Sequence, residues 1–178
     1  IFSLKPKVIG FSCYIWNIEM TLKICSNIKK LDPNIIILLG GPEVSYHSAH
    51  LMEREGYIDY IIKGEGEISS KMLFNHLQSG QGRLEDIVGL VYRDRGTVQE
   101  NHGWGLIENL DLIPFPYDEK ENLDNKILYY ESSRGCPFNC SYCMSSTFKG
   151  VRFLPLDRVN KELMWFIEKN VPLVKFVD

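Results

Sequence analysis

Three cysteines fall within one short window of the chain, with three and then two residues between them: Cys136, Cys140 and Cys143. Three thiolates this close together can converge on a single soft metal centre, and they leave one coordination position without a cysteine. The loop that carries them is rich in Gly, Pro, Asn and Ser, so it offers no apolar core that buried thiols could fill. The spacing therefore favours a metal centre.

A structural zinc ion is the alternative occupant of this loop. Structural zinc sites use four closed ligands, yet the nearest histidine in sequence is His102, so a tetrahedral site would need a distant partner. An iron–sulfur cluster is favoured for that reason. The other two cysteines, Cys13 and Cys25, stand far apart in apolar surroundings. We expect no disulfide framework, because the cysteine count is odd and the cysteines are unevenly distributed. We expect a protein of the reducing cytosol, because the sequence shows no signal peptide.

The motif Cys136-x3-Cys140-x2-Cys143, with the aromatic Tyr142 before its last cysteine and a predicted strand upstream, resembles the signature of radical S-adenosylmethionine (SAM) enzymes. The resemblance implies that the three thiolates hold a [4Fe–4S] cluster whose remaining iron binds SAM, and that the Tyr142 ring lies near the adenine. Such an iron can pass one electron to the sulfonium and release a 5′-deoxyadenosyl radical. An electron donor such as a flavodoxin or ferredoxin is the implied partner.

The first half of the chain alternates between strands and helices that could position a second site. Apolar runs at 7–12, 35–39 and 58–62 predict strands, and each is followed by a stretch with helical periodicity. The helix after Gly40-Gly41-Pro42 is expected to continue for about three turns, to Gly56. Three strand–helix units in succession predict a parallel, doubly wound α/β domain that binds ligands outside the carboxyl ends of its strands.

This half resembles the cobalamin-binding domain that precedes the barrel in one large radical SAM subgroup, which includes the anaerobic magnesium-protoporphyrin IX monomethyl ester cyclase. Residues 8–12 resemble the third strand of that domain, 38–43 its fourth strand and loop, and 62–67 its fifth strand. The fold class implied is a partial flavodoxin-like (Rossmann-like) parallel sheet. The resemblance implies cobalamin contacts from small and polar residues at the strand ends. These residues are Ser12, Gly40, Gly41, Pro42, Gly64, Glu65 and Gly66. From the residues alone, tight turns explain the glycines about equally well. A side chain added at Gly41 is expected to obstruct the cobalamin tail and leave the fold largely intact.

The second half predicts a β-hairpin near 87–100, a Pro-containing linker, and then a strand from Ile127, a helix capped by Asp157 and a final strand from Leu173. We expect three parts. Residues 1–82 form the C-terminal part of the cobalamin-binding domain, 83–126 the hairpin and linker, and 127–178 the start of a radical SAM barrel. The chain begins without Met and stops within a strand pattern, so we expect a fragment truncated at both ends and inactive by itself.

Two histidines are candidate cobalt ligands. His47 and His50 follow the Gly-Gly-Pro turn, and an exposed polar helix face is the favoured explanation for both. The Asp-x-His-x-x-Gly motif that supplies a histidine to cobalt in other cobalamin proteins does not occur in this sequence.

Other residues have both a chemical and a structural explanation. Glu65 and Glu67 could form an acid–base pair or complement the dipole of the next helix. Trp104 could stack on a cofactor or anchor its loop. Arg134 could lie near the cluster or pair with Glu131.

The composition limits the remaining functions. The net charge is -3 without a basic run, so nucleic-acid binding is not expected. The longest aliphatic run, 35–39, is far too short to cross a membrane. The resemblance to cobalamin-binding radical SAM enzymes implies methyl transfer or oxidative cyclisation by an oxygen-sensitive, cytoplasmic enzyme of anaerobic chemistry that acts on an unknown substrate. The alternative is a non-catalytic flavodoxin-like module with a structural zinc site.

Overall fold

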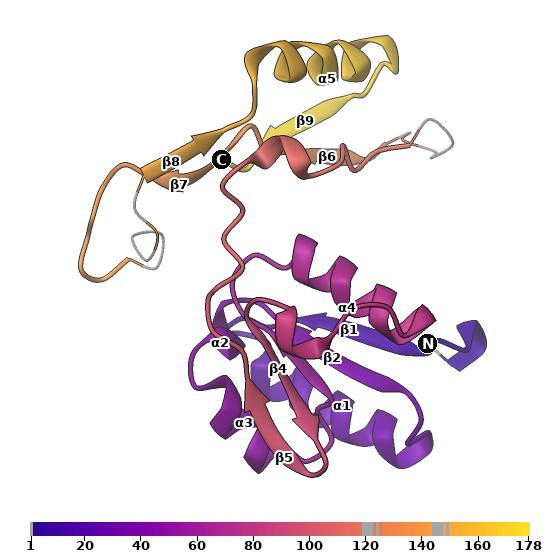
Figure 1. Cartoon of the computed structure of the whole chain (residues 1–178). Coiled ribbons are helices and arrows are strands. Elements are labelled where there is room, and N and C mark those ends of the chain that lie inside the picture. Colours follow the sequence, from indigo (N-terminus) through magenta and orange to yellow (C-terminus); the bar gives the residue numbers. More distant parts are fainter. Residues whose placement is uncertain (1, 119–122, 124, 144–147, 149) are drawn as a thin grey trace. The chain divides into compact units, whose positions relative to one another are not determined.

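The computed structural model describes residues 2–118, 123, 125–143, 148 and 150–178. The chain divides into two compact units, Ile1–Ile107 and Glu108–Asp178 (Figure 1). Among the described residues, no helix is long and apolar enough to span a membrane.

The first unit is built on one sheet with the order β1-β2-β3-β4-β5. Strands β1 (Val8–Ser12), β2 (Ile36–Gly40) and β3 (Tyr60–Ile62) pair in parallel, as predicted. Strand β2 lies in the centre of these three, and its aliphatic side chains are buried between two layers of helices. The predicted α/β class with a parallel-dominated sheet is therefore confirmed.

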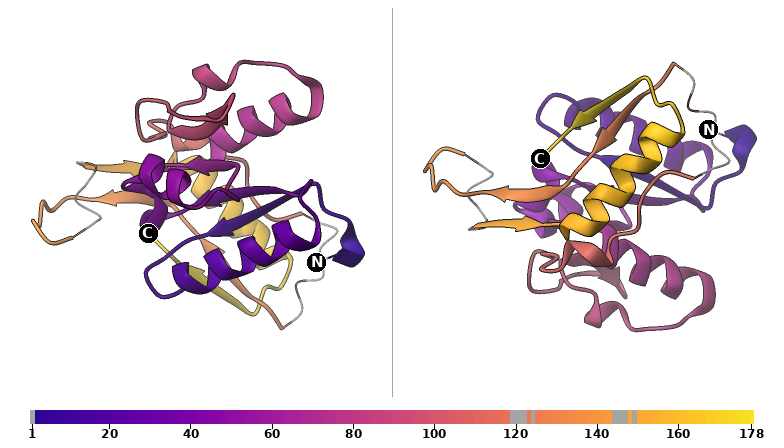
Figure 2. Two further views of the ribbon diagram at one scale, coloured as in Figure 1. Left: turned by 90° about the horizontal axis from the view of Figure 1, so that it is seen from below. Right: turned by 90° about the horizontal axis from the view of Figure 1, so that it is seen from above.

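Helices cover both faces of this sheet (Figure 2). Helices α1 (Ile18–Leu31), α2 (Pro42–Ser45) and α3 (Ser48–Arg54) contribute to the core cluster on one face. Helix α4 (Glu67–Ser79) contributes to the cluster on the other face. Two apolar layers around a central strand explain why the run at 35–39 has no polar alternation.

The prediction of a single helix between Gly41 and Gly56 is wrong, because the chain forms the two short helices α2 and α3 there. The helical path is interrupted at His47, whose φ of 55° lies in the left-handed region. Ser45 and Ser48 turn their hydroxyls back onto the carbonyls four residues earlier. Such side-chain bonds compete with regular helical geometry, and the sequence pattern did not reveal them.

The predicted hairpin forms from β4 (Leu90–Asp94) and β5 (Thr97–Glu100). From the sequence this hairpin was expected in a connecting segment, 83–126, whereas in the structure β4 pairs antiparallel with β3 and the first compact unit extends to Ile107. The apolar residues of β4 cover the edge that β3 would otherwise expose. This long-range pairing has no local sequence signature.

The second unit contains a strand–helix–strand element, as predicted. Strands β6 (Ile127–Tyr130) and β9 (Leu173–Phe176) pair in parallel, and α5 (Leu156–Glu168) connects them. The helix N-cap is Pro155, two residues earlier than the predicted cap Asp157, which lies in the first turn. Three short 3-10 turns complete the described elements, at Phe2–Leu4, Leu84–Asp86 and Leu110–Leu112.

The hairpin in this unit was not predicted. Strands β7 (Ser133–Cys136) and β8 (Gly150–Phe153) pair antiparallel, and the cysteine-bearing loop connects their far ends (Figure 1). The cysteine loop thus extends from a two-stranded stem that begins directly after β6.

Candidate cofactor sites at the strand ends and the cysteine loop

The carboxyl ends of the three parallel strands are level with one another. Ser12 lies opposite Gly40 in the β1–β2 register, and Gly40 lies opposite Ile62 in the β2–β3 register. The Cys13 N–H continues the pairing by donating to the Gly40 carbonyl at 2.7 Å. The residues predicted to contact cobalamin at the ends of different strands are therefore brought to one edge of the sheet.

Ser45 connects two of these strand ends, and sequence analysis missed it. Its buried hydroxyl donates to the Gly41 carbonyl at 2.8 Å and accepts from the Gly64 N–H at 3.2 Å. One side chain therefore fixes the distance between the loop after β2 and the loop after β3. A serine within a short helix carries no sequence signal for this role, because its partner lies 19 residues away.

Gly41 and Gly64 are required by contacts within the chain. Gly41 has a φ of 99°, and a Cβ there would stand 2.7 Å from the Cys13 carbonyl oxygen. Gly64 has a φ of 73°, and a Cβ there would overlap the Trp104 carbonyl oxygen at 1.7 Å. Positive φ and close backbone approach both exclude a side chain. The expectation that a side chain at Gly41 leaves the fold largely intact is therefore wrong.

Gly40 and Gly66 differ from Gly41 and Gly64, because a Cβ at either position would meet no steric clash. A Cβ on Gly40 would lie 3.7 Å from the Ile62 carbonyl oxygen, and one on Gly66 would lie 3.6 Å from the Ser70 Oγ. Both distances are normal van der Waals contacts. Chain packing therefore does not explain why these two positions lack a side chain.

Glu65 and Trp104 connect the strand edge to the segment that closes the first unit. The Glu65 carboxylate accepts from the Ile107 N–H at 2.7 Å, and the Glu65 N–H donates to the Trp104 carbonyl at 3.3 Å. The Trp104 ring lies 4.9 Å from the Tyr46 ring. These contacts match a loop-anchoring role for Trp104. Glu67 lies in the first turn of α4, where a negative charge is favoured by the helix dipole.

Two aromatic side chains stack just beyond the end of β1. The rings of Tyr14 and Trp16 are 4.6 Å apart and inclined by only 7°. Trp16 and the intervening Ile15 are each 77% exposed. Apolar side chains gathered on a surface mark a binding site more often than isolated ones do. This pair was not predicted, although three large apolar residues in a loop between a strand and a helix are a usable signal.

His47 and His50 are both exposed, as the favoured explanation predicted. His47 is the N-cap of α3 and His50 lies within that helix. Among the residues that the structure describes, neither histidine belongs to a group of three or more side chains that could hold a metal ion.

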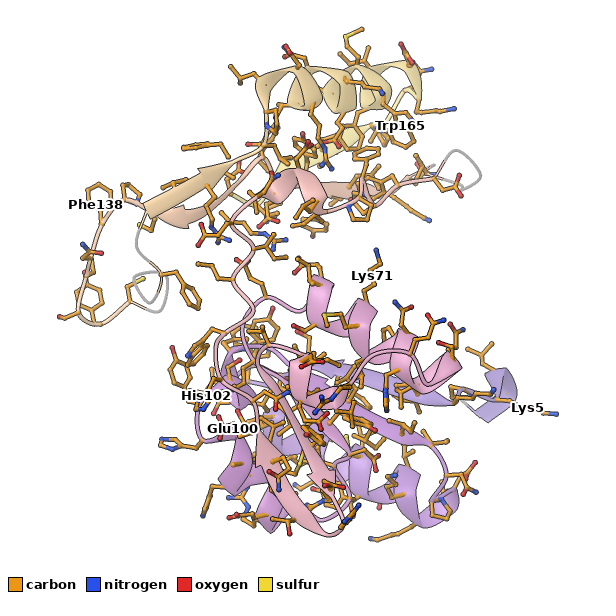
Figure 3. The ribbon with its side chains drawn as sticks, viewed as in Figure 1. Lys5, Lys71, Glu100, His102, Phe138 and Trp165 are labelled. Atoms are coloured by element: carbon orange, nitrogen blue, oxygen red, sulfur yellow. The ribbon has the colours of Figure 1, made fainter. Side chains whose placement is uncertain are left out.

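The cysteine loop begins at the last residue of β7. Cys136 pairs with Gly150 in the hairpin stem, and further along the loop the Cys143 N–H donates to the Cys140 carbonyl at 3.1 Å. The side chains of Tyr142 and Phe138, the latter labelled in Figure 3, are 91% and 68% exposed. The loop therefore exposes two aromatic rings, at Phe138 and Tyr142.

The chemistry of these donors fits an iron–sulfur cluster. Among the described residues none of the three cysteines of the loop forms a disulfide, and they are half-buried at Cys136 and Cys140 and exposed at Cys143. Within the described part of the chain, no three metal-ligating side chains are gathered into one set. Sequence and donor type thus support the assignment of the three cysteines, which stays a prediction.

Arg134 pairs with Glu131 within the stem of the cysteine loop. The Arg134 Nε donates to the Glu131 carboxylate at 2.7 Å, and both side chains are partly shielded from solvent. This ion pair was one of the two roles predicted for Arg134.

The other two cysteines have no role in a metal centre. Cys13 and Cys25 are both fully buried in the core of the first unit. Burial raises the pKa of the Cys13 thiol to about 11 and that of the Cys25 thiol to about 12. Because the thiolate is the nucleophile and the metal ligand, both side chains are inert at neutral pH.

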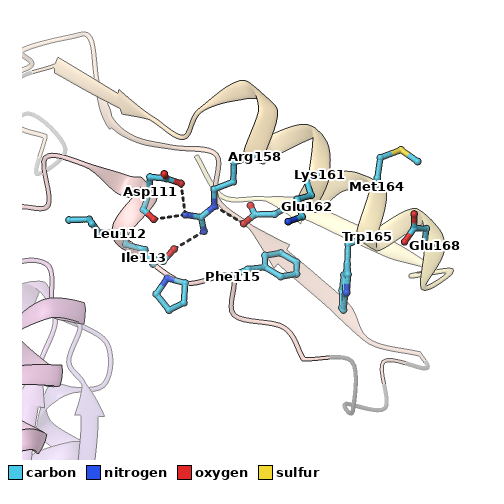
Figure 4. A pocket seen from close by; sticks show the side chains of 11 residues that line it. Asp111, Leu112, Ile113, Phe115, Arg158, Lys161, Glu162, Met164, Trp165 and Glu168 are labelled. Carbon is cyan, nitrogen blue, oxygen red and sulfur yellow. Dashed lines mark hydrogen bonds and ion pairs between the residues drawn. The ribbon is translucent and has the colours of Figure 1, made fainter.

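A groove of about 870 Å³ lies in the second unit between residues 111–115 and helix α5 (Figure 4). Arg158 lies at one end and donates to the Glu162 carboxylate, to the carbonyl and carboxylate of Asp111, and to the Ile113 carbonyl. The Glu162 carboxylate also accepts from the Tyr130 hydroxyl at 2.8 Å. The guanidinium is therefore engaged in holding the linker against α5.

Comparison with known proteins identifies relatives of the chain. Residues 1–73 match the B12 binding domain family. The chain is 31% identical over 182 residues to the uncharacterized methyltransferase PH0819 of Pyrococcus horikoshii, which covers 97% of this chain and 39% of that protein. It is 29% identical over 182 residues to the cobalamin-dependent radical SAM methyltransferase TokK of Streptomyces tokunonensis, which covers 94% of this chain and 26% of that protein.

A solved structure shares the fold. The cobalamin-dependent S-adenosylmethionine radical enzyme OxsB, solved with aqua-cobalamin bound, superimposes with a TM-score of 0.75 and 23% identity, over 99% of this chain and 26% of that chain. The chain therefore spans well under half of the length of each of these proteins. The resemblance inferred from the sequence is thereby confirmed: residues 1–73 match the B12 binding domain, and the chain is related to cobalamin-dependent radical SAM enzymes.

Proposed function

We propose that the chain is part of a cobalamin-binding radical SAM enzyme that cleaves SAM reductively at a [4Fe–4S] cluster. The observation that carries the proposal is the combination, in one chain, of a B12 binding domain match with the Cys136-x3-Cys140-x2-Cys143 loop directly after the first strand of a strand–helix–strand element. Methyl transfer or oxidative cyclisation is the reaction, and the names of the two relatives favour methyl transfer.

The cysteine loop would hold the cluster. Cys136, Cys140 and Cys143 would be its ligands, and the exposed Tyr142 ring is available to the adenine of SAM. When bound, such a cluster supplies the one-electron reduction that cleaves the sulfonium. The β7–β8 stem would determine where Cys136 stands relative to the strand ends, because Cys136 is itself a paired strand residue.

Cobalamin would bind at the carboxyl edge of β1–β3. When bound, it supplies a cobalt centre able to carry a methyl group. The stacked rings of Tyr14 and Trp16 offer an apolar surface to the corrin, and the missing side chains of Gly40 and Gly66 let a ligand approach the backbone. Ser12 and Pro42 stay predicted contacts at the same edge. Gly41, Gly64 and Glu65 would shape the edge through their contacts within the chain.

The complete enzyme would need partners that this chain does not include. Because the chain spans 39% and 26% of its two relatives, the activity belongs to the full-length protein. A flavodoxin or ferredoxin would donate the electron, and a cytoplasmic, anaerobic setting would protect the cluster from oxygen.

Anaerobic reconstitution with iron and sulfide tests the proposal. The full-length protein should develop broad absorption near about 400 nm, typical of a [4Fe–4S] centre, and should cleave SAM when a reductant is added. The Cys140→Ala variant should lose both properties. The Cys25→Ala variant, which removes a buried thiol elsewhere, is the matched control and should keep both. A colourless protein loaded with zinc would overturn the proposal.

A further inference from the structure

The carboxylate of Asp178 lies at the base of the hairpin that carries the cysteines. Its Oδ1 accepts from the Ser132 N–H at 2.5 Å and from the Ser133 N–H at 2.6 Å, and the Ser132 hydroxyl donates to the same carboxylate. Two consecutive backbone amides and one hydroxyl therefore point at a single side chain. In Figure 1 the C-terminal end of the chain meets the start of β7 at this point.

Ser132 is the junction between the sheet and the cysteine hairpin. It lies between the end of β6 and the start of β7. Its carbonyl accepts from the N–H of Leu154, the residue just after β8, at 2.9 Å. Both strands of the stem thus converge on Ser132. The N–H and the hydroxyl of Ser132 both donate to the Asp178 carboxylate. The parallel pairing of β6 and β9 brings Asp178 there, since the Val177 N–H donates to the Tyr130 carbonyl at 2.9 Å.

The bend at Ser132 decides the direction of the stem. Pairing between β7 and β8 keeps the hairpin itself together, but it does not fix how the hairpin leaves the β6–β9 sheet. Among the contacts described, those of Asp178 join the end of one sheet strand to the first residues of the hairpin. Hydrogen bonds to an ionised acceptor are shorter and stronger than neutral ones, so they suit this fixing role.

We propose that Asp178 is a positioning residue for the cysteine loop. Its carboxylate fixes the bend at Ser132 and thereby the direction in which the β7–β8 stem carries Cys136, at its loop end, away from the β6–β9 sheet. This inference rests on the proposed function, in which Cys136 is a cluster ligand. Groups that orient metal ligands without touching the metal typically change affinity or activity about 10–100-fold when they are removed.

Two substitutions separate the contributions of this side chain. Asp178→Ala removes both oxygens and leaves the Ser132 and Ser133 amides without their acceptor. Asp178→Asn keeps one oxygen that can accept from both amides but replaces the other with an amide donor. Glu168→Ala is the matched control, because it removes an exposed carboxylate at the end of α5 in the same unit.

The experiment uses the full-length protein with three readouts. Hydrogen exchange of residues 132–136 is measured without a cluster. Iron retained through a chelator challenge and the reduction potential of the cluster are measured after anaerobic reconstitution. Asp178→Ala should speed exchange at 132–136 and lower cluster retention about 10-fold or more. Asp178→Asn should restore much of the slow exchange and much of the cluster retention. Glu168→Ala should match the unsubstituted protein in both measurements.

The outcomes separate this inference from the proposed function. Unchanged hydrogen exchange at residues 132–136 in Asp178→Ala would overturn the positioning role. Faster hydrogen exchange with unchanged iron retention and an unchanged reduction potential of the cluster would overturn it as well. If the unsubstituted protein holds no iron, the proposed function fails, and the exchange measurement still decides whether Asp178 fixes the bend. If Asp178→Ala does not fold, Asp178→Asn provides the decisive comparison: it should retain less iron than the unsubstituted protein, though more than half of it, and retention equal to that of the unsubstituted protein would overturn the positioning role.

Discussion

The hydroxyl of Tyr117 caps the backbone of Tyr129. It donates to the Tyr129 carbonyl at 2.7 Å and accepts from the Tyr129 N–H at 2.8 Å. Strand β6 pairs with β9 on one side, and no described strand pairs with its other side. One side chain of the linker thus satisfies a donor and an acceptor at a strand edge that would otherwise be open to other chains.

Removing this hydroxyl should weaken the second unit. In Tyr117→Phe the Tyr129 amide and carbonyl lose their partner and depend on water, so we expect a loss of about 1–2 kcal/mol in the free energy of unfolding. Denaturant titration followed by circular dichroism measures it. Tyr129→Phe also removes one tyrosine hydroxyl, from a half-exposed ring, and is the control. Equal stability of the two variants would contradict the capping role.

Glycines at the strand edge should respond differently to substitution. Gly41→Ala puts a side chain at positive φ against the Cys13 backbone, so we expect a loss of about 2 kcal/mol or more in folding stability. Gly40→Ala meets only ordinary contacts and should cost less than about 1 kcal/mol. Thermal unfolding of both variants checks this order.

A larger side chain at Gly40 should affect cobalamin binding. Gly40→Leu should lower the amount of hydroxocobalamin that the folded full-length protein keeps through desalting, and unchanged retention would remove Gly40 from the cobalamin site.

The stacked pair after β1 should affect cobalamin and leave the fold unchanged. Trp16 is 77% exposed, so Trp16→Ala should leave the unfolding midpoint nearly unchanged. If the ring contacts the corrin, the same change should weaken binding of hydroxocobalamin to the full-length protein several-fold. Leu31→Ala, which removes a side chain that is 72% exposed at the far end of α1, is the control. Identical cobalamin affinities for the two variants would refute the contact.

The five thiols should differ strongly in reactivity. In protein without a cluster, iodoacetamide at pH 8 should modify the exposed Cys143 quickly and spare Cys13 and Cys25 until the chain unfolds, because burial raises both of their pKa values. Mass spectrometry of digested protein measures the modification at each site. Rapid labelling of Cys25 in the folded chain would contradict its buried place in the core.

The same pKa values predict a dependence of stability on pH. A thiol whose pKa is raised by folding stays protonated in the folded state while the unfolded chain releases its proton, so its contribution is complete below the ordinary value of 9.0. Stability should therefore decline as the pH rises from about 9 toward 11. Denaturant titrations at pH 8 and pH 10 measure the decline, which Cys25→Ala should reduce.

Local patterns in the sequence determined the elements and the chemistry of the candidate site. The continuous aliphatic run at 35–39 is enough to predict a strand covered on both faces, since no polar side chain interrupts it. The amphipathic stretch at 156–168 predicts α5 in the same way. The spacing of the three cysteines indicates a soft metal centre without any knowledge of the fold, because close thiols on one loop have few other uses.

Only the tertiary structure decided which residues perform which role at these sites. The cysteine stem, the pairing of β4 with β3, the contacts of Ser45 and the packing of Trp104 against Gly64 all join residues that lie far apart in sequence or have no periodic pattern. For a glycine the sequence reveals the missing side chain and leaves open which atom occupies the space. At Gly41 and Gly64 that atom belongs to the backbone of the chain itself, whereas a Cβ at Gly40 or Gly66 would meet only ordinary contacts, and backbone proximity of this kind is established only when distant strands come together.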